Sequence, residues 1–495
     1  MATSNAREPW VLAIDIGTSS VRAFGFDADG GAIPALHAQA MHEARTDGGA
    51  HEIDADGLVE AAAGCVDAVL RKAGPQAGAF AAVGVSSFWH SMVGVGAEGR
   101  AVSPIYTWAD ARPADAARHL RERLDPAAYH ARTGCALHPS YFPARMLWLR
   151  EADPGTWARA VRWISPGEYL MARLLGEECP SISMASATGL FDQNRQEWDP
   201  ETMGVVGVEP ERLRSAHRWR RSGEPTPGLT PEWARRWPAL AHVPWAPCIG
   251  DGAASNLGNG CATDGRIAIN LGTSGAIRVL WRAASVEIPP ELWCYRLDEE
   301  RPVMGAAFSD GGNVYGWMRQ ALALPDPVAA EHLLASRPPA CHGLTFLPFL
   351  HGERSPGWRP EATATLHGLR ATTTALDLLQ AGLEAVVLRF ALMADVLRDR
   401  FPQAREIVAS GGALAESPVW ASLLTDALGQ PITLAPGHEA TPRGAALTAL
   451  RAAGALADEA DAPAPDGTVL RPDPGRHETL RAALERQRDL EARLA

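Results

Sequence analysis

Lysine is almost absent from this chain of 495 residues, because Lys72 is the single lysine among 46 lysine and arginine residues. A P-loop requires a lysine that reaches the β and γ phosphates of a nucleotide, and a protein kinase requires one on a strand. Lys72 stands in the sequence RKAG, which is typical of a helix end. Neither kind of site is therefore expected, and Schiff-base chemistry is excluded on the same ground. Any phosphate must be bound by backbone amides, hydroxyl groups, arginine or a metal ion.

Paired cysteines and long apolar runs are missing as well. The seven cysteines are scattered and never form a CxxC pair, which excludes a disulfide framework and a zinc knuckle. We expect them to be buried core residues in a reducing compartment. The apolar run before Asp15 is too short for a signal peptide, and the longest uncharged stretch, Ala73 to Ala97, is interrupted by glycine and serine. We expect a cytoplasmic protein.

An excess of basic charge is also lacking, since 58 acidic residues give a formal net charge of -12. Nucleic acids and anionic membranes require a concentrated basic face, so neither is an expected partner. The composition, 46% hydrophobic and 21% charged, is that of a soluble globular protein. The length suggests two domains of about 250 residues.

An internal repeat organises the chain. Residues 11–26 read VLAIDIGTSSVRAFGF and residues 266–281 read RIAINLGTSGAIRVLW, each an apolar run, a Gly-Thr-Ser turn and a second apolar run. This pattern predicts two β-hairpins and a duplicated domain. The proline-rich segment before Asp251 places the boundary near residue 245. We predict a first domain over residues 1–245, a second over 246–458, and a linker with a C-terminal helix over 459–495.

The remaining pattern predicts an α/β fold with a hairpin opening each sheet. We expect a strand over residues 79–87 and a strand with a glycine turn within 407–417. Helices are expected over residues 141–150, 374–401, 418–428, 443–456 and 478–495, and a linker rich in Asp, Ala and Pro over 459–474.

The two Gly-Thr-Ser turns are candidate phosphate sites, because such turns expose amide N–H groups and hydroxyls. A single turn of this kind is more often a plain turn, whereas two that face each other across an interdomain cleft would hold a polyphosphate from both sides. Asp15 stands two residues before Gly17 and is a candidate Mg²⁺ ligand through water, or else a hydrogen-bonded turn residue. Asp251 is a candidate general base at the cleft, or else part of a common Asp-Gly turn.

Taken as a set, five segments resemble the FGGY carbohydrate kinases over about residues 10–455. They read IDIGTSS, GDGAASNLGNG with INLGTSG, LPFLHGERSP, SGGALAESPVW and HEATPRGAALTAL. The resemblance implies two ribonuclease-H-like domains of the actin and hexokinase superfamily with an interdomain cleft, the sugar held mainly by the first and ATP mainly by the second.

The resemblance also implies residue roles. Asp251 would be the catalytic base, and Mg²⁺ would be held at Asp15 and Asp251. The residues implied to bind ATP are Gly17, Thr18, Ser19, Gly272, Thr273, Gly312, Gly316, Gly412 and Glu416. Glu416 stands where some relatives have a polar amide near the adenine.

Segments such as VSSFWHSMVGV and PIYTWADAR look most like the gluconate kinase branch, although its members usually have Met where this chain has Trp89. The expected substrate-binding residues are Trp89, His90, Ser91, Trp108, Asp110 and Arg112. His90 and Arg112 are candidates for a sugar carboxylate, the tryptophans for the C–H faces of a sugar and Asp110 for its hydroxyls. Alternatively, the tryptophans belong to the core and Arg112 is a structural partner of Asp110.

The first hypothesis is an ATP-dependent kinase that converts gluconate to 6-phosphogluconate. A homodimer is the oligomeric state that we consider. The alternative is a xylulose, ribulose or other polyol kinase of the same family. A different class is a catalytically silent nucleotide-binding sensor or an actin-like ATPase, against which Asp251 argues.

Overall fold

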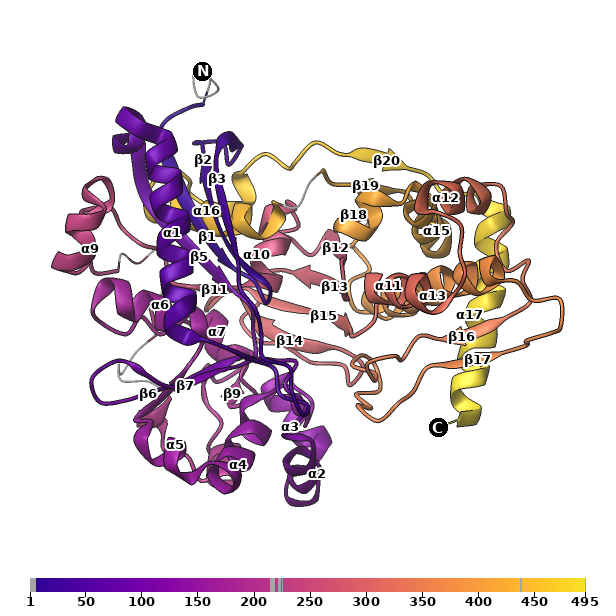
Figure 1. Ribbon diagram of the computed structural model, residues 1–495, viewed down its shortest axis with the longest axis horizontal. Helices are drawn as coiled ribbons and strands as arrows, with labels where there is room; N and C mark the ends of the chain where they lie inside the picture. The colour runs from indigo at the N-terminus through magenta and orange to yellow at the C-terminus, as the bar shows by residue number, and fades with distance from the viewer. Residues whose placement is uncertain (1–5, 214–218, 221–223, 225, 437–438, 495) are drawn as a thin grey trace. The chain divides into compact units, whose positions relative to one another are not determined.

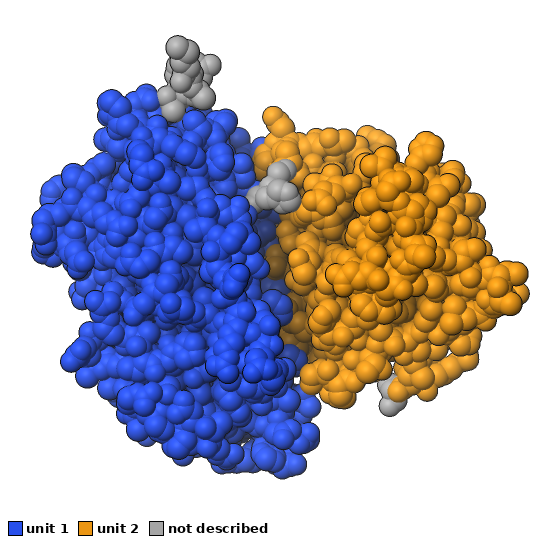
Figure 2. All heavy atoms as spheres, viewed as in Figure 1, with its two compact units in different colours: residues 1–262, 280–303, 439–464 blue, residues 263–279, 304–438, 465–495 orange. Residues whose placement is uncertain are grey.

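A computed structural model describes residues 6–213, 219–220, 224, 226–436 and 439–494. The chain forms two compact units, coloured separately in Figure 2. Unit 1 comprises residues 1–262, 280–303 and 439–464, and unit 2 comprises residues 263–279, 304–438 and 465–495. The units therefore interleave along the chain, and the domain boundary at residue 245 remains a prediction.

The main sheet of unit 1 has the strand order β11-β5-β1-β2-β3 (Figure 1). Its strands are β1 (Trp10–Ile16), β2 (Ser20–Phe26), β3 (Ala32–Met41), β5 (Phe80–Ser87) and β11 (Ile249–Gly250). β1 and β2 are the predicted first hairpin, and β1 pairs parallel with β5, which pairs parallel with β11. Every residue of β1 is buried, which explains its almost continuous apolar sequence.

Three helices pack on or beside this sheet: α1 (Ala55–Ala73), α10 (Asp251–Gly258) and α16 (Ala440–Ala452). Lys72 lies in the last turn of α1, as predicted. α16 approaches β5 so closely that a Cβ atom on Gly84 would lie 1.9 Å from the Ala445 carbonyl oxygen. Glycine at position 84 thus permits the helix to pack on the strand.

The remainder of unit 1 is built on a smaller sheet of order β4-β7-β6-β8. Its strands are β4 (Glu52–Ile53), β6 (Met92–Val95), β7 (Ala101–Tyr106) and β8 (Arg162–Ile164), and a ribbon pairs β9 (Phe191–Asp192) with β10 (Glu197–Trp198). The helices are α2 (Ala114–Arg123), α3 (Pro126–Thr133), α4 (Phe142–Ala152), α5 (Pro154–Arg159), α6 (Pro166–Leu175), α7 (Ile182–Ser186), α8 (Pro200–Val206) and α9 (Pro231–Arg236).

The second large sheet has the order β14-β15-β13-β12-β18-β19-β20. Its strands are β12 (Arg266–Leu271), β13 (Gly275–Leu280), β14 (Trp293–Arg296), β15 (Pro302–Phe308), β18 (Glu406–Ser410), β19 (Ile432–Leu434) and β20 (Thr468–Leu470). β12 pairs antiparallel with β13 and parallel with β18, just as β1 pairs with β2 and β5. The predicted repeat is thus a repeat of topology as well as of sequence.

Unit 2 adds a ribbon of β16 (Thr345–Leu347) and β17 (Thr365–His367), and six helices among its described residues. These are α11 (Gly312–Ala321), α12 (Pro327–Ala335), α13 (Ala375–Arg400), α14 (Gly412–Glu416), α15 (Pro418–Leu428) and α17 (Pro474–Leu494). No helix in the part of the chain that the structure describes is long and apolar enough to cross a membrane.

Three expectations need correction. The helix expected at 443–456 runs from Ala440 to Ala452, because Pro442 is tolerated in a first turn and Gly454 has a left-handed φ of 72°. The expected linker at 459–474 contains β20, whose backbone pairs with β19 despite its Asp- and Pro-rich flanks. Six cysteines are buried as expected, but Cys341 is exposed.

Candidate functional site

Asp15 and Asp251 lie at the carboxyl ends of strands in one parallel set. Asp15 on β1 is paired with Ser86 on β5, and Gly250 on β11 is paired with Ser87, so Asp251 follows at the same edge. Ligands of α/β sheets bind beyond the carboxyl ends of the strands. The register therefore assembles the two predicted carboxylates at the edge where chemistry is expected.

Asp15 is buried and held on both carboxylate oxygens. Ser86 Oγ donates to Oδ1 at 2.8 Å, and Arg22 donates to Oδ2 from Nε at 3.1 Å and from Nη2. Among the described residues, no group of three or more His, Cys, Asp or Glu side chains could hold a metal ion. Mg²⁺ usually keeps several waters and binds to one or two carboxylates plus substrate phosphates, so this carboxylate pair fits that mode rather than a closed protein cage.

Asp251 is the first residue of α10 and is only partly buried. Its Oδ1 accepts a hydrogen bond from the Gly252 N–H at 2.7 Å, which orients the carboxylate at the helix start. Trp89 packs directly behind it: a Cβ atom on Gly250 would lie 1.8 Å from Trp89 Nε1. Ser183 ties the two together, because its carbonyl accepts from Trp89 Nε1 at 2.9 Å and its Oγ accepts from the Gly250 N–H at 3.0 Å.

His90 stands beside Trp89 in an aromatic cluster. Its ring centroid lies 4.9 Å from that of Tyr141 and 5.1 Å from that of Tyr295, and Trp293 stacks on Tyr295 at 4.4 Å. His90 has a left-handed φ of 61°, and its Nδ1 donates to the Ala187 carbonyl at 2.7 Å. The backbone strain and this hydrogen bond together hold the imidazole in one orientation.

Ser91 and Trp108 connect the predicted sugar residues to the first Gly-Thr-Ser turn. Ser91 Oγ donates to the Trp89 carbonyl at 3.2 Å and accepts from the Trp108 N–H at 3.1 Å. Trp108 Nε1 in turn donates to Thr18 Oγ1 at 3.2 Å. In that turn the Gly17 N–H donates to the Ser20 carbonyl at 2.9 Å, and Ser19 is exposed. The structure thus brings together Trp89, His90, Ser91, Trp108 and the turn.

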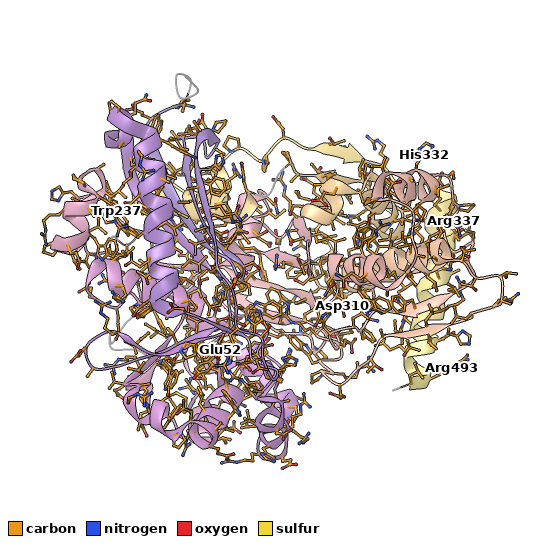
Figure 3. The ribbon with its side chains drawn as sticks, viewed as in Figure 1. Glu52, Trp237, Asp310, His332, Arg337 and Arg493 are labelled. Carbon is orange, nitrogen blue, oxygen red and sulfur yellow. The ribbon has the colours of Figure 1, made fainter. Side chains whose placement is uncertain are left out.

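Arg112 is bound by two carboxylates. Its Nε donates to Asp110 Oδ1 at 3.0 Å, and its Nη2 donates to Asp110 Oδ2 at 2.5 Å and to Glu52 Oε1 at 2.6 Å (Glu52 is labelled in Figure 3). The guanidinium also lies 4.4 Å from the ring centroid of Trp148. Partial burial lowers the pKa of Arg112, but the hydrogen bonds that it donates to Asp110 and Glu52 outweigh this effect and raise the pKa overall. This geometry realises the alternative in which Arg112 is a structural partner of Asp110.

Arg145 was not predicted from the sequence, although it holds three of these segments in place. The side chain is fully buried on α4 and donates to the carbonyls of His90 at 2.7 Å, Thr107 at 2.8 Å and Ser140 at 3.0 Å. Burial lowers its pKa to about 10. The sequence pattern predicted a helix over residues 141–150, but nothing in that pattern distinguished this buried arginine from an exposed one.

The second Gly-Thr-Ser turn is enclosed by two glycine motifs of unit 2. The Gly312 N–H donates to the Gly272 carbonyl at 2.7 Å, and the Asn313 N–H donates to the Thr273 carbonyl at 3.1 Å. Gly411 has a φ of 116°, and a Cβ atom there would lie 2.3 Å from the Leu271 carbonyl oxygen. Glycine is therefore required where these backbones meet.

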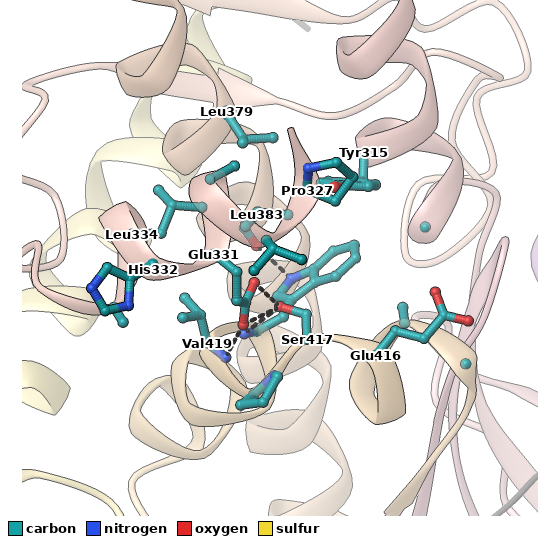
Figure 4. A pocket seen from close by; sticks show the side chains of 18 of the residues that line it. Tyr315, Pro327, Glu331, His332, Leu334, Leu379, Leu383, Glu416, Ser417 and Val419 are labelled. Atoms are coloured by element: carbon teal, nitrogen blue, oxygen red, sulfur yellow. Dashed lines mark hydrogen bonds between the residues drawn. The ribbon is translucent and has the colours of Figure 1, made fainter. Parts of the chain in front are cut away.

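A cavity of about 970 Å³ opens at this turn, lined entirely by residues of unit 2 (Figure 4). Of the residues expected to bind ATP, its lining includes Gly272, Thr273, Gly312, Gly412 and Glu416. Gly316 lies on α11 and does not line it. Glu331, which the sequence did not indicate, also lines it and accepts hydrogen bonds from Ser417 Oγ at 2.9 Å and the Val419 N–H at 2.8 Å.

The remaining lining is mainly apolar and includes Leu379, Leu383 and Trp420. Cavities of 300–1,000 Å³ with apolar walls and a few polar groups are typical of small-molecule sites. Among the residues that the structure describes, no lysine or arginine lines the cavity. This chemistry suits a flat, weakly polar base at the apolar walls and a polar extension at the glycine turn.

The chain matches known proteins along most of its length. Residues 10–258 match the N-terminal domain, and residues 267–453 the C-terminal domain, of the FGGY family of carbohydrate kinases. A gluconokinase of Bacillus licheniformis is 27% identical over 90% of this chain and 88% of its own. A xylulose kinase of Streptomyces rubiginosus is 31% identical over 91% of this chain and 88% of its own. The crystal structure of a gluconate kinase from Lactobacillus acidophilus has the same fold, with a TM-score of 0.90, 23% identity and 98% coverage of each chain.

Proposed function

The chain belongs to the FGGY family of carbohydrate kinases, and from this premise we propose that it transfers the γ-phosphoryl group of ATP to gluconate, giving 6-phosphogluconate. The family is one of sugar kinases, phosphotransferases that use ATP as co-substrate. The observation that carries the choice of gluconate is the match to a gluconokinase over nine tenths of the chain, together with the segments of the gluconate kinase type around His90.

Asp251 would act as the general base. Its carboxylate stands at the strand edge with one oxygen oriented by the Gly252 N–H, and a hydroxyl proton of the sugar would pass to it. Trp89, packed against Gly250, would limit the space beside the base and offer an apolar face to the sugar. Positioning of this kind supplies most of the catalysis in phosphoryl transfer.

Mg²⁺ would be held at Asp15 and Asp251 through water, where it supplies positive charge to the phosphates when bound. Arg22 and Ser86 fix the Asp15 carboxylate in the orientation this requires. The glycine-lined turn around Gly272 and Thr273 would bind phosphates, and the apolar end of the cavity the adenosine. We further propose that the protein is cytoplasmic and forms a homodimer. Light scattering of the purified chain tests the homodimer.

A xylulose or related neutral-sugar kinase is the second candidate, favoured by the state of Arg112. Its charge is already balanced by Asp110 and Glu52, so a substrate carboxylate would have to compete with two protein carboxylates. The 31% identity to a xylulose kinase points the same way.

The base is tested with Asp251→Asn, and Asp115→Asn on the exposed start of α2 serves as the matched control. We expect turnover to fall by roughly 100-fold to 10,000-fold while ATP binding, measured by calorimetry, stays nearly the same. The control should keep the parent's turnover. If Asp251→Asn retains near-parental turnover, Asp251 is not the base.

The substrate is tested by ADP release with gluconate, xylulose, ribulose, glycerol and erythritol. For gluconate, His90→Ala and Arg112→Ala should each lower kcat/KM by about tenfold to a hundredfold, while activity on neutral polyols changes little, because a charge-assisted hydrogen bond is lost only with the acid. A parent enzyme that prefers a neutral sugar, or variants that lose both substrate classes alike, would contradict gluconate and support the second candidate.

A further inference from the structure

A buried carboxylate stands directly before the glycine motif that encloses the second turn. Asp310 follows β15, is 5% exposed and is labelled in Figure 3. It accepts hydrogen bonds from His351 Nδ1 at 2.7 Å, the His351 N–H at 3.1 Å and Asn313 Nδ2 at 3.0 Å. Burial raises the pKa of Asp310, and the His351 contacts oppose that rise. The hydrogen bonds from His351 therefore favour the charged form of the buried Asp310 carboxylate.

His351 has the opposite exposure. Its side chain is 61% exposed, although Asp310 holds both its Nδ1 and its backbone N–H. Within the described ranges of the chain, Nε2 of His351 has no hydrogen-bond partner. A carboxylate that accepts from Nδ1 sets the orientation of an imidazole and leaves Nε2 available to a ligand.

Asn313 links this pair to the turn. Its Nδ2 lies 3.1 Å from His351 Nδ1, its Oδ1 accepts from the Gly311 N–H at 2.7 Å, and its own N–H donates to the Thr273 carbonyl at 3.1 Å. Asn313 also lines the cavity, next to Gly272 and Gly312. The imidazole therefore lies beside Asn313, a residue that lines the glycine-turn end of the cavity.

The glycine-turn end of the cavity has few cationic side chains that could bind phosphate. Among the described residues, the lining of the cavity contains Glu331, Glu416 and His332 but neither lysine nor arginine, whereas a nucleoside triphosphate is a polyanion. Phosphate oxygens are bound most strongly by charged donors. An oriented imidazole near the turn offers an N–H donor to a phosphate oxygen without the long side chain of lysine or arginine.

We propose that His351, held by Asp310, donates a hydrogen bond from Nε2 to a phosphate oxygen of the nucleotide bound at the Gly272–Thr273 turn. The proposal rests on the proposed function, because it requires the cavity to bind a nucleotide. His351 is then a phosphate-binding residue, and Asp310 is a positioning residue that acts through it.

The experiment is calorimetric titration of adenosine, ADP and ATP into the parent and four variants. His351→Leu should weaken ATP binding by about tenfold to a hundredfold and leave adenosine binding unchanged, because only the phosphates lose a donor. His351→Gln should restore part of the affinity, since its amide nitrogen can donate, and Asp310→Asn should have an intermediate effect. The control is His367→Leu, which removes an exposed imidazole at the end of β17 in the same unit.

The outcomes separate the two proposals. A parent chain that binds no nucleotide overturns the proposed function. If the parent binds ATP and the ratio of ATP affinity to adenosine affinity is the same in the parent and in His351→Leu, only the role of His351 is overturned. Equal losses for adenosine and ATP, or a raised KM for the sugar alone, also overturn it. Adenosine binding by each variant serves as the check of folding.

Discussion

Removal of the Arg145 guanidinium should destabilise unit 1 and disturb the predicted sugar site together. Arg145 is fully buried and donates to the carbonyls of His90, Thr107 and Ser140. Arg145→Met keeps much of the apolar volume and removes this donor from the His90 and Ser140 carbonyls, whereas the Thr107 carbonyl still accepts from the Asp110 N–H at 3.1 Å.

The magnitude follows from two opposing terms. The two buried acceptors left unsatisfied cost about 2 kcal/mol each, or about 4 kcal/mol together. Against this, the buried cation is itself unfavourable: burial lowers the pKa of Arg145 from 12.5 to about 10, which corresponds to about 3 kcal/mol. The net loss in the free energy of unfolding should be about 1 kcal/mol.

The assay is urea unfolding followed by tryptophan fluorescence, combined with steady-state kinetics. The KM for the sugar should rise while the KM for ATP, whose cavity lies in unit 2, stays the same. Arg145→Lys should recover only part of the stability, because an ammonium group cannot donate to all three carbonyls as the planar guanidinium does. Arg118→Met, which removes an exposed arginine paired with Asp115, should cost less than about 0.5 kcal/mol.

A different result would refute the reasoning. If Arg145→Met is as stable as the parent, the cost of burying the cation equals the value of its hydrogen bonds. If stability falls but both KM values stay unchanged, Arg145 holds the fold without positioning the sugar residues.

Two further predictions concern a turn and a helix cap. Gly272→Val should raise the KM for ATP more than the KM for the sugar, because the side chain would occupy the space of the phosphates. It should cost little stability, because the nearest atom to a Cβ at this position is Asn270 Oδ1 at 3.9 Å. Equal effects on both KM values would favour a plain turn. Asp153 caps α5, and hydrogen bonds from Thr156 lower its pKa, so its contribution is present at neutral pH and is lost as the pH falls through that lowered pKa. Asp153→Ala should therefore cost about 1 kcal/mol in urea at pH 7, and the difference from the parent should shrink in acid; a difference independent of pH would contradict this.

Features that depend on neighbouring residues could be predicted from the amino-acid sequence. Both hairpins formed where the apolar runs flank a Gly-Thr-Ser turn, and α15 has the predicted bounds of Pro418 and Leu428. α13 begins after Thr374, whose side chain forms a capping box with Asp377. Propensity, apolar periodicity and capping act over a few residues, so they can be read from the chain directly. The FGGY family was likewise identified from short motifs.

Which side chains contact one another depends on the packing of segments that are distant in the sequence. In the sequence, Arg145 has no feature that sets it apart from other helical arginines. In the structure it is buried and donates hydrogen bonds to backbone carbonyls of three converging segments. Tyr295 contacts His90 although about two hundred positions separate them, and His351 meets Asp310 across a segment of forty residues with no local pattern. The interleaved units have the same origin, since contacts between distant segments depend on how strands are ordered in a sheet. Local physical chemistry determines the strands and helices, whereas their packing determines which polar groups are buried together, and with them the partners of Arg112, Asp310 and His351.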